Sequence, residues 1–204
     1  MGAMTSLAAI PTGRPFTVDD LGAMPDDGNR YEVIDGMLIV TPAPGWHHQE
    51  MSFVAAIELR KACPRELRVM IAPFALRTAH DSEVQPDVLV TRYVDLTPKN
   101  LPVAPLLVVE TLSPSTALHD RNTKKAHYER MGVPSYWLLD PTAPGALTVF
   151  ELRDGAYVQV AHVVGDEPHA AERPFPVTVV PARLLDGTRP LGEFMVPTPG
   201  RLDG

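Results

Sequence analysis

The chain has 204 residues, of which 45% are apolar, and a formal net charge of −7 at pH 7. This length favours one domain with a full core, and the acidic balance argues against a protein that coats nucleic acid non-specifically. No run approaches the roughly eighteen apolar residues of a membrane helix, and a single cysteine, Cys63, excludes an internal disulfide and a thiolate metal cluster. We therefore expect a cytoplasmic protein without membrane contact.

The first part of the chain predicts an arm, a short helix and a hairpin. Residues 1–16 contain proline and glycine with little periodicity, and we expect a flexible arm there. Thr17 followed by Asp20 is typical of a capping box, which predicts a short helix. Asp35-Gly36 lies between two apolar-rich segments and predicts a two-residue turn, with the hairpin over 31–40.

The next part of the chain predicts one helix and two strands. Apolar residues at helical spacing predict a helix over about 47–62. Residues 67–77 favour one strand, in which Pro73 indicates a bulge or an edge position. We expect a polar turn over 78–83 and a short apolar strand over 88–90.

Residues 106–140 predict a strand, a turn, a helix and a second strand. The apolar run before Glu110 suits a strand buried on both faces, and the hydroxyls of Ser115 and Thr116 can cap the helix expected over 118–131. A second apolar strand is expected over 136–139. Two strands joined by a helix are usually parallel, and ligands bind beyond the carboxyl ends of such strands. Glu110 stands at such an end.

The remainder of the chain predicts antiparallel strands and a tail. Strands are expected over 147–152 and 157–164, with a last one over 177–180. The proline-rich segment 187–204 has few apolar residues, so we expect it to be disordered. A single domain over 17–186 is then the simplest organisation.

Two acids are candidates for chemistry, because Asp87 begins one apolar strand and Glu110 ends another. Charged residues are rarely buried unless they are paired or bind a metal. Two carboxylates on one sheet suit Mg²⁺ or Mn²⁺, and a nearby lysine could act on a water or stabilise charge on a phosphate. The alternative is structural: Asp87 would be a turn residue, and Glu110 would pair with Lys124.

These residues resemble a known nuclease pattern. Pro86-Asp87 followed by Glu110-Thr111-Leu112 resembles the PD-(D/E)XK nuclease superfamily. More closely, the chain resembles the Uma family of "putative restriction endonucleases", through landmarks whose order and spacing are specific over about residues 17–185. The landmarks are Tyr31-Glu32-Val33-Ile34-Asp35-Gly36, His48-Gln49, Gln85-Pro86-Asp87-Val88, Val109-Glu110, Ser113-Pro114-Ser115-Thr116, Asp120, Lys124, Tyr128, Gly132-Val133-Pro134, Tyr136-Trp137 and Asp140-Pro141.

The resemblance implies an α/β, restriction-endonuclease-like fold, with a mixed central sheet flanked by helices. It implies an endonuclease that hydrolyses phosphodiester bonds of nucleic acid, with DNA favoured over RNA. Mg²⁺ or Mn²⁺ would be held by Asp87 and Glu110. A homodimer would be one arrangement that cuts two strands.

The lysine of the nuclease motif should stand two residues after the acid, but Leu112 is there. The resemblance suggests that the lysine has moved to the helix, at Lys124, which shares a face with Tyr128 at i,i+4. Lys125 points about 100° away around the helix. We therefore choose Lys124 as catalytic, and we expect the fold to survive its loss.

Two further residues could line the site. The resemblance implies this role for Glu32, whose alternative is an outward-facing acid on a strand. His48 could contact a phosphate or a metal-bound water, or it could be a solvent-exposed histidine near a helix cap. Tyr128 is expected to pack in the core. Arg121, Lys124, Lys125 and Arg130 could form a phosphate patch that makes the cleft more basic than the protein, or merely a solvated helix face.

Two rival functions remain open, because a fold does not settle a function. One is a non-catalytic module on this fold that binds nucleic acid or a protein, which the acidic balance and the displaced lysine favour. The other is a metal-dependent hydrolase that acts on a small phosphate ester.

Overall fold

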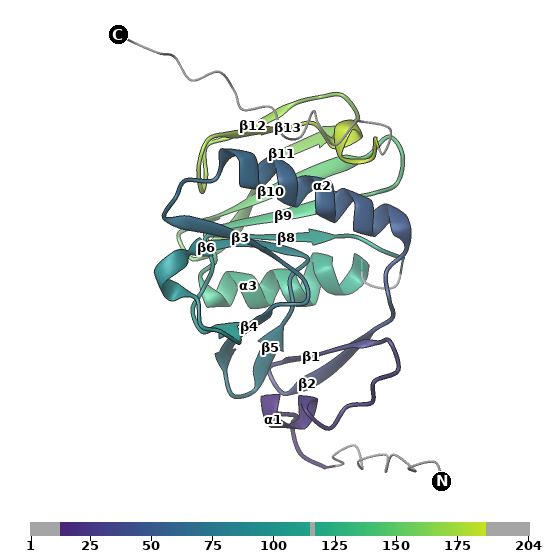
Figure 1. Cartoon of the computed structure of the whole chain (residues 1–204), viewed down its shortest axis with the longest axis vertical. Helices are drawn as coiled ribbons and strands as arrows, with labels where there is room; N and C mark the ends of the chain where they lie inside the picture. The colour runs from purple at the N-terminus through teal and green to yellow at the C-terminus, as the bar shows by residue number, and fades with distance from the viewer. Residues whose placement is uncertain (1–12, 115–116, 187–204) are drawn as a thin grey trace.

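The structure is a computed structural model that describes residues 13–114 and 117–186, and its strands form two larger sheets and a two-stranded ribbon (Figure 1). The expected capping by Ser115 and Thr116, the tail and most of the arm lie outside the described residues. The five-stranded sheet has the order β2 (Met37–Thr41), β1 (Arg30–Ile34), β5 (Ser82–Val84), β4 (Ala75–Ala79), β7 (Asn100–Leu101). The six-stranded sheet has the order β11 (Ala156–Val164), β10 (Ala146–Arg153), β9 (Ser135–Asp140), β8 (Leu107–Thr111), β6 (Val88–Arg92), β3 (Leu67–Ile71). The ribbon pairs β12 (His169–Ala171) with β13 (Val177–Val179).

Helices α2 (Trp46–Ala62) and α3 (Lys125–Met131) lie on opposite sides of the six-stranded sheet, and α1 (Val18–Leu21) lies beside β1 of the five-stranded sheet. A π-helical turn (His119–Lys124) precedes α3, and 3₁₀ turns occur at Tyr93–Asp95 and Pro181–Leu184. In Figure 1, α2 crosses one side of the six-stranded sheet, and α3 lies on the other side, toward the five-stranded sheet. Within the described residues, no helix is both long and apolar enough to cross a membrane.

Two apolar cores explain this layering. Alternate residues of β8 enter different cores: Leu107 and Val109 pack with α2, whereas Val108 packs with Tyr128 of α3. The second core also contains Ile34 of β1 and other residues of the five-stranded sheet, so it lies between the two sheets. The apolar run before Glu110 is therefore buried on both faces, as its composition predicts.

The central sheet is mixed, which confirms the predicted α/β fold class. β8 pairs with β9 in parallel, and the π-helical turn and α3 connect them. β6 pairs with β8, and β9 with β10, in antiparallel register. The predicted short helix and hairpin are also present: Thr17 and Asp20 form a capping box, and Asp35-Gly36 turns with φ of 51° and 77°.

The prediction of one strand over 67–77 is wrong. β3 ends at Ile71 and belongs to the six-stranded sheet, whereas β4 starts at Ala75 and belongs to the five-stranded sheet. Pro73 lies between them and has no amide hydrogen for a ladder. The expected polar turn over 78–83 is instead the tip of the β4–β5 hairpin, since β5 begins at Ser82. The two- and three-residue strands β7 and β12 were not predicted, because they are too short to show periodicity.

The helix expected over 118–131 is present but not uniform. A π-helical turn occupies His119–Lys124, and regular α-helix follows to Met131. Gly132 has φ of 83° and stops the helix in the left-handed conformation. Such π turns inside α-helices occur frequently at functional sites.

The two hairpin glycines give a matched test of the N-terminal packing. Gly36 and Gly155 both have positive φ, of 77° and 82°, so alanine should destabilise each hairpin by about 1 kcal/mol. A Cβ at Gly36 would lie 2.7 Å from Cβ of Pro15, whereas a Cβ at Gly155 meets nothing within 4 Å. We expect Gly36→Ala to lower the free energy of unfolding by at least about 1 kcal/mol more than Gly155→Ala, measured by urea denaturation. Equal losses would show that the segment at Pro15 moves aside.

Candidate active site

The two predicted acids lie side by side on the same face of the six-stranded sheet. β6 and β8 are antiparallel with Val88 opposite Val109, and one further step in this register places Asp87 opposite Glu110. Both acids point to the α3 side, because alternate residues share a face. Asp87 Oδ2 accepts a hydrogen bond of 2.9 Å from the backbone amide of Thr111, which ties the start of β6 to the end of β8.

Lys124 lies at the centre of the acids. Its Nζ is 3.0 Å from Oε1 of Glu110, 3.2 Å from Oε2 of Glu32 and 3.9 Å from Oδ1 of Asp120, and the residue is 2% exposed. Burial alone would lower the pKa of Lys124, but Glu110 and Glu32 together raise it above its ordinary value. The ammonium therefore stays charged at neutral pH.

Glu110 receives a second donor from the same helix. The hydroxyl of Tyr128 donates to Oε1 of Glu110 over 2.7 Å, so Tyr128 and Lys124 bind one oxygen from the same helical face. Burial raises the pKa of Tyr128 well above its usual value, which keeps the hydroxyl protonated as a donor. Burial, assisted by the charges of Asp87, Asp120 and Glu32, raises the pKa of Glu110 to about 8, although Lys124 acts in the opposite direction.

Glu32 points into the site and not outward from its strand. It is fully buried on β1; Oε1 accepts a hydrogen bond of 2.6 Å from the amide of Gln85, and Oε2 faces Lys124. That second oxygen has no hydrogen bond within the described part of the chain. Since Glu32 belongs to the five-stranded sheet and Glu110 to the six-stranded sheet, the site lies between the two sheets and Lys124 connects them.

His48 is buried against Asp87 and is not an exposed residue at a helix cap. Nε2 lies 3.1 Å from Oδ2 of Asp87, and Nδ1 is buried without a hydrogen-bond partner among the described residues. Burial would raise the pKa of Asp87, but His48, Arg30 and Lys124 bring it well below its usual range. The Asp87 carboxylate is therefore ionised.

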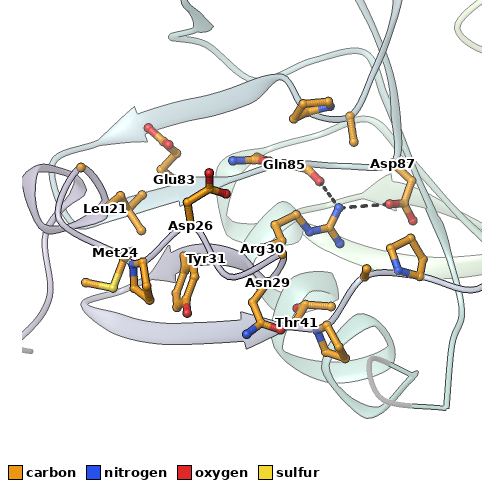
Figure 2. Close-up of a pocket in the computed structure, with 18 of the residues that line it drawn as sticks. Leu21, Met24, Asp26, Asn29, Arg30, Tyr31, Thr41, Glu83, Gln85 and Asp87 are labelled. Atoms are coloured by element: carbon orange, nitrogen blue, oxygen red, sulfur yellow. Dashed lines mark hydrogen bonds and ion pairs between the residues drawn. The ribbon is translucent and has the colours of Figure 1, made fainter. Parts of the chain in front are cut away.

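Arg30 belongs to the site but was not anticipated from the sequence. Its Nη1 donates to Oδ1 of Asp87 over 3.2 Å and to the carbonyl of Gln85 over 3.1 Å (Figure 2). Arg30 stands two residues before Glu32 on β1, so both side chains lie on one face of the strand. This two-residue spacing was the feature of the sequence that could have identified Arg30. Asp120, which was not predicted as a site residue either, lies one turn before Lys124.

The possible phosphate patch on the helix does not form. Arg121 approaches Asp140 at 3.8 Å, Arg130 pairs with Asp35, and Lys125 lies 4.4 Å over the ring of Phe150. Only Lys124 of this group faces the acids. The alternative of a solvated helix face describes the other three.

A pocket of about 900 Å³ opens onto Asp87, His48 and Arg30 (Figure 2). Its lining includes four acids and two arginines, and both arginines are already paired. Arg77 Nε lies 2.5 Å from Glu83, and Arg30 contacts Asp87. The expectation that the cleft is more basic than the protein is therefore wrong for the described residues. The four acids of the lining are Asp19, Asp26, Glu83 and Asp87.

The donor set fits a hard divalent cation, although the described residues contain no group of three or more His, Cys, Asp or Glu arranged to hold a metal. Mg²⁺ is commonly held by one or two carboxylates, with waters and substrate phosphates completing the shell. Asp87 and Glu110 are two such carboxylates. Four buried acids face two permanent cations here, and Oε2 of Glu32 has no hydrogen bond. An added positive charge would correct this imbalance.

Comparison with known proteins shows the family and the fold of the chain. A family model described as "Putative restriction endonuclease", named Uma2, matches residues 18–183. The chain belongs to this family. It also resembles the crystal structure of a "putative nuclease belonging to DUF820" from Anabaena variabilis ATCC 29413, with a TM-score of 0.60, 21% identity, and coverage of 78% of this chain and 90% of that one. This likeness shows the fold. None of the curated proteins compared with the chain matches it.

The burial of Lys124 corrects the expectation that its loss leaves the fold intact. Lys124→Met would leave Glu110 and Glu32 buried without their ammonium, so we expect the free energy of unfolding to fall by about 3 kcal/mol or more. Lys125→Met is the matched control and should lose about 1 kcal/mol or less, because it removes only a contact with Phe150. Urea denaturation of both variants measures the difference. Similar losses would show that Lys124 contributes no buried ion pairing.

Proposed function

We propose that this protein is a divalent-metal-dependent nuclease that hydrolyses phosphodiester bonds, with DNA favoured over RNA as substrate. One observation carries the proposal: the Lys124 ammonium lies between Glu110 and Glu32, and the adjacent Asp87 opens onto the pocket. The family description and the nuclease-like fold support it.

Asp87 and Glu110 would hold Mg²⁺ or Mn²⁺, as the two carboxylates that share one face of the sheet. When bound, such an ion acts as a Lewis acid toward a phosphoryl oxygen. The amide of Thr111, together with His48 and Arg30, fixes the Asp87 carboxylate in the ionised state that a metal ligand needs.

Lys124 would stabilise the negative charge that develops on the phosphate. Its raised pKa makes it a donor and not a general base at neutral pH. Glu110, which Tyr128 holds by a hydrogen bond, orients the Lys124 ammonium from one side, and Glu32 orients it from the other. Glu32 would assist through Oε2, which faces Lys124 at 3.2 Å, has no hydrogen bond among the described residues and could accept one from an attacking water.

A second candidate is a metal-dependent hydrolase of a small phosphate ester. The observation that favours it is the acidic pocket, in which both lining arginines are already paired with acids. A long polyanion gains little from such a surface, whereas a small ester needs only the few groups near Asp87. Homodimerisation and a cytoplasmic location stay predictions from the sequence.

Metal binding can be tested without any activity measurement. An ion that binds only the folded state at 100 times its Kd stabilises a protein by about 2.7 kcal/mol, so saturating Mn²⁺ should raise the melting temperature of the wild type by several degrees. Asp87→Asn and Glu110→Gln should lose this shift. Glu167→Gln, which changes an exposed acid elsewhere, should keep it. A shift of equal size in all four proteins would place the metal at another site.

Catalysis can be tested with plasmid, single-stranded DNA, RNA and p-nitrophenyl phosphate in the presence of Mn²⁺. We expect Asp87→Ala and Lys124→Ala to lose about 10²-fold or more in rate, because each removes a group that acts on the metal or the phosphate. Lys125→Ala should retain the rate, since Lys125 lies over Phe150. Circular dichroism at the assay temperature confirms that each variant is folded.

The substrates separate the candidates. Cleavage of the ester without cleavage of nucleic acid would favour the second candidate. Equal activity in wild type and Asp87→Ala would contradict both candidates, and no activity with an intact metal response would indicate a non-catalytic module.

A further inference from the structure

The pocket extends well beyond the acids that surround Lys124. From Asp87 and His48 it passes Arg30 and continues along the other face of β1 and β5 (Figure 2). Val33 lies opposite Glu83 in antiparallel register, so Tyr31 and Glu83 share this other face of the five-stranded sheet, whereas Glu32 points to Lys124. The cluster and the outer part of the pocket are therefore separate surfaces joined at Arg30.

Arg30 is the cation at this junction. Its side chain is 22% exposed, and Nη1 carries both of its hydrogen bonds, to Asp87 and Gln85. Nε lies 3.9 Å from Oε2 of Glu32, and Nη2 makes no hydrogen bond with any described residue, so it can donate to a ligand. A guanidinium has five donors in a fixed fork that fits phosphate oxygens, so Arg30 can hold Asp87 and a phosphate at the same time.

The outer part of the pocket has a different chemistry. Figure 2 shows Asp26, Tyr31 and Glu83 there, together with the apolar side chains of Leu21 and Met24. Glu83 is paired with Arg77 through Oε2, which leaves Oε1 as an acceptor. Carboxylates repel a phosphate, but they accept hydrogen bonds from the exocyclic amino groups of bases. Tyrosine rings bind bases by stacking, whatever the sequence. This part of the pocket suits a base and not a phosphate backbone.

We infer that this pocket binds one unpaired nucleotide of the strand being cut, with its phosphate on Arg30 and its base against Tyr31, and with the amino group of the base toward Asp26 and Glu83. The inference rests on the proposed function, which supplies the phosphodiester at Asp87. A volume of about 900 Å³ leaves room for one nucleotide. A base inside a duplex cannot enter such a pocket without leaving the stack.

A pocket for one unpaired nucleotide predicts which substrates are cut fastest. Single strands and frayed or flapped ends present an unpaired nucleotide at no unstacking cost, so they should be cut faster than a closed duplex. Bases that carry an amino group should be preferred over thymine. It also explains how an acidic protein can select nucleic acid, because recognition comes from one base and one phosphate and not from a basic surface.

Binding of mononucleotides tests the pocket independently of cleavage. Calorimetric titration of the full chain with deoxycytidine monophosphate, thymidine monophosphate, deoxycytidine and inorganic phosphate should show tightest binding of the first. Tyr31→Leu should weaken it about 10- to 100-fold, whereas Tyr31→Phe, which keeps the ring, should stay within about threefold. Asp26→Asn should reduce the preference for cytosine over thymine, and Arg30→Lys should weaken the nucleotide more than the nucleoside. Equal affinities in wild type and Tyr31→Leu, or no binding of either nucleotide, would overturn the inference.

Cleavage rates provide a second test of the pocket. Wild type should cut a single-stranded oligonucleotide at least about tenfold faster than the same sequence closed in a blunt hairpin, and Tyr31→Leu should lose most of this ratio. Equal rates on both substrates would overturn the inference and leave the proposed nuclease function standing. Tyr31-dependent binding of deoxycytidine monophosphate without cleavage of any substrate would support the pocket and count against the nuclease.

Discussion

The buried ammonium of Lys124 joins β1, near the start of the chain, to β8 and the π-helical turn, which are distant from β1 in the sequence. It contacts Glu32 of β1, Glu110 of β8 and, within its own helix, Asp120. A buried charge is tolerated only where partners surround it, so these elements are held to one arrangement. A slip of β6 against β8 by one residue would turn Asp87 to the opposite face of the sheet and away from the site. The contacts that hold the two sheets together are thus the same contacts that arrange the side chains of the site.

The charge balance of the cluster bears on the divalent cation that we propose for this site. Glu32, Asp87, Glu110 and Asp120 outnumber the permanent cations Lys124 and Arg30, and burial prevents water from screening the difference. The pKa of Glu110 is raised mainly by burial, and the neighbouring negative charges add to this effect. The outer part of the pocket is acidic through other residues, Asp26 and Glu83, so a group with a hydrogen to donate fits it better than a phosphate backbone.

The sequence predicted the parts of the site that depend on local pattern. Asp87 and Glu110 stood at the ends of apolar strands, and helical periodicity separated Lys124 from Lys125. What it could not predict depends on packing between segments distant in the chain. The partners of Arg121, Arg130 and Lys125 are Asp140, Asp35 and Phe150, from three other segments, and they remove the expected phosphate patch. The outer pocket lies where β1 meets β5, two strands separated by more than forty residues and paired through a short ladder. The passage of the chain from the six-stranded to the five-stranded sheet at Pro73 could likewise not be predicted from local pattern.

The displaced lysine does not by itself indicate a relic of a nuclease. Leu112, at the motif position, packs among apolar residues in the core between the sheets. Lys124 reaches the Glu110 carboxylate from the helix instead, by way of the π-helical turn. The hydroxyl of Tyr136 donates to the carbonyl of Asp120 over 2.9 Å and satisfies a backbone acceptor of that turn. These buried tyrosines therefore also fix the position of the lysine. Tyr136 stabilises the π-helical turn, and Tyr128 donates to the same Glu110 oxygen as Lys124. The helix thus places a positive charge beside Glu110, where the proposed chemistry needs it.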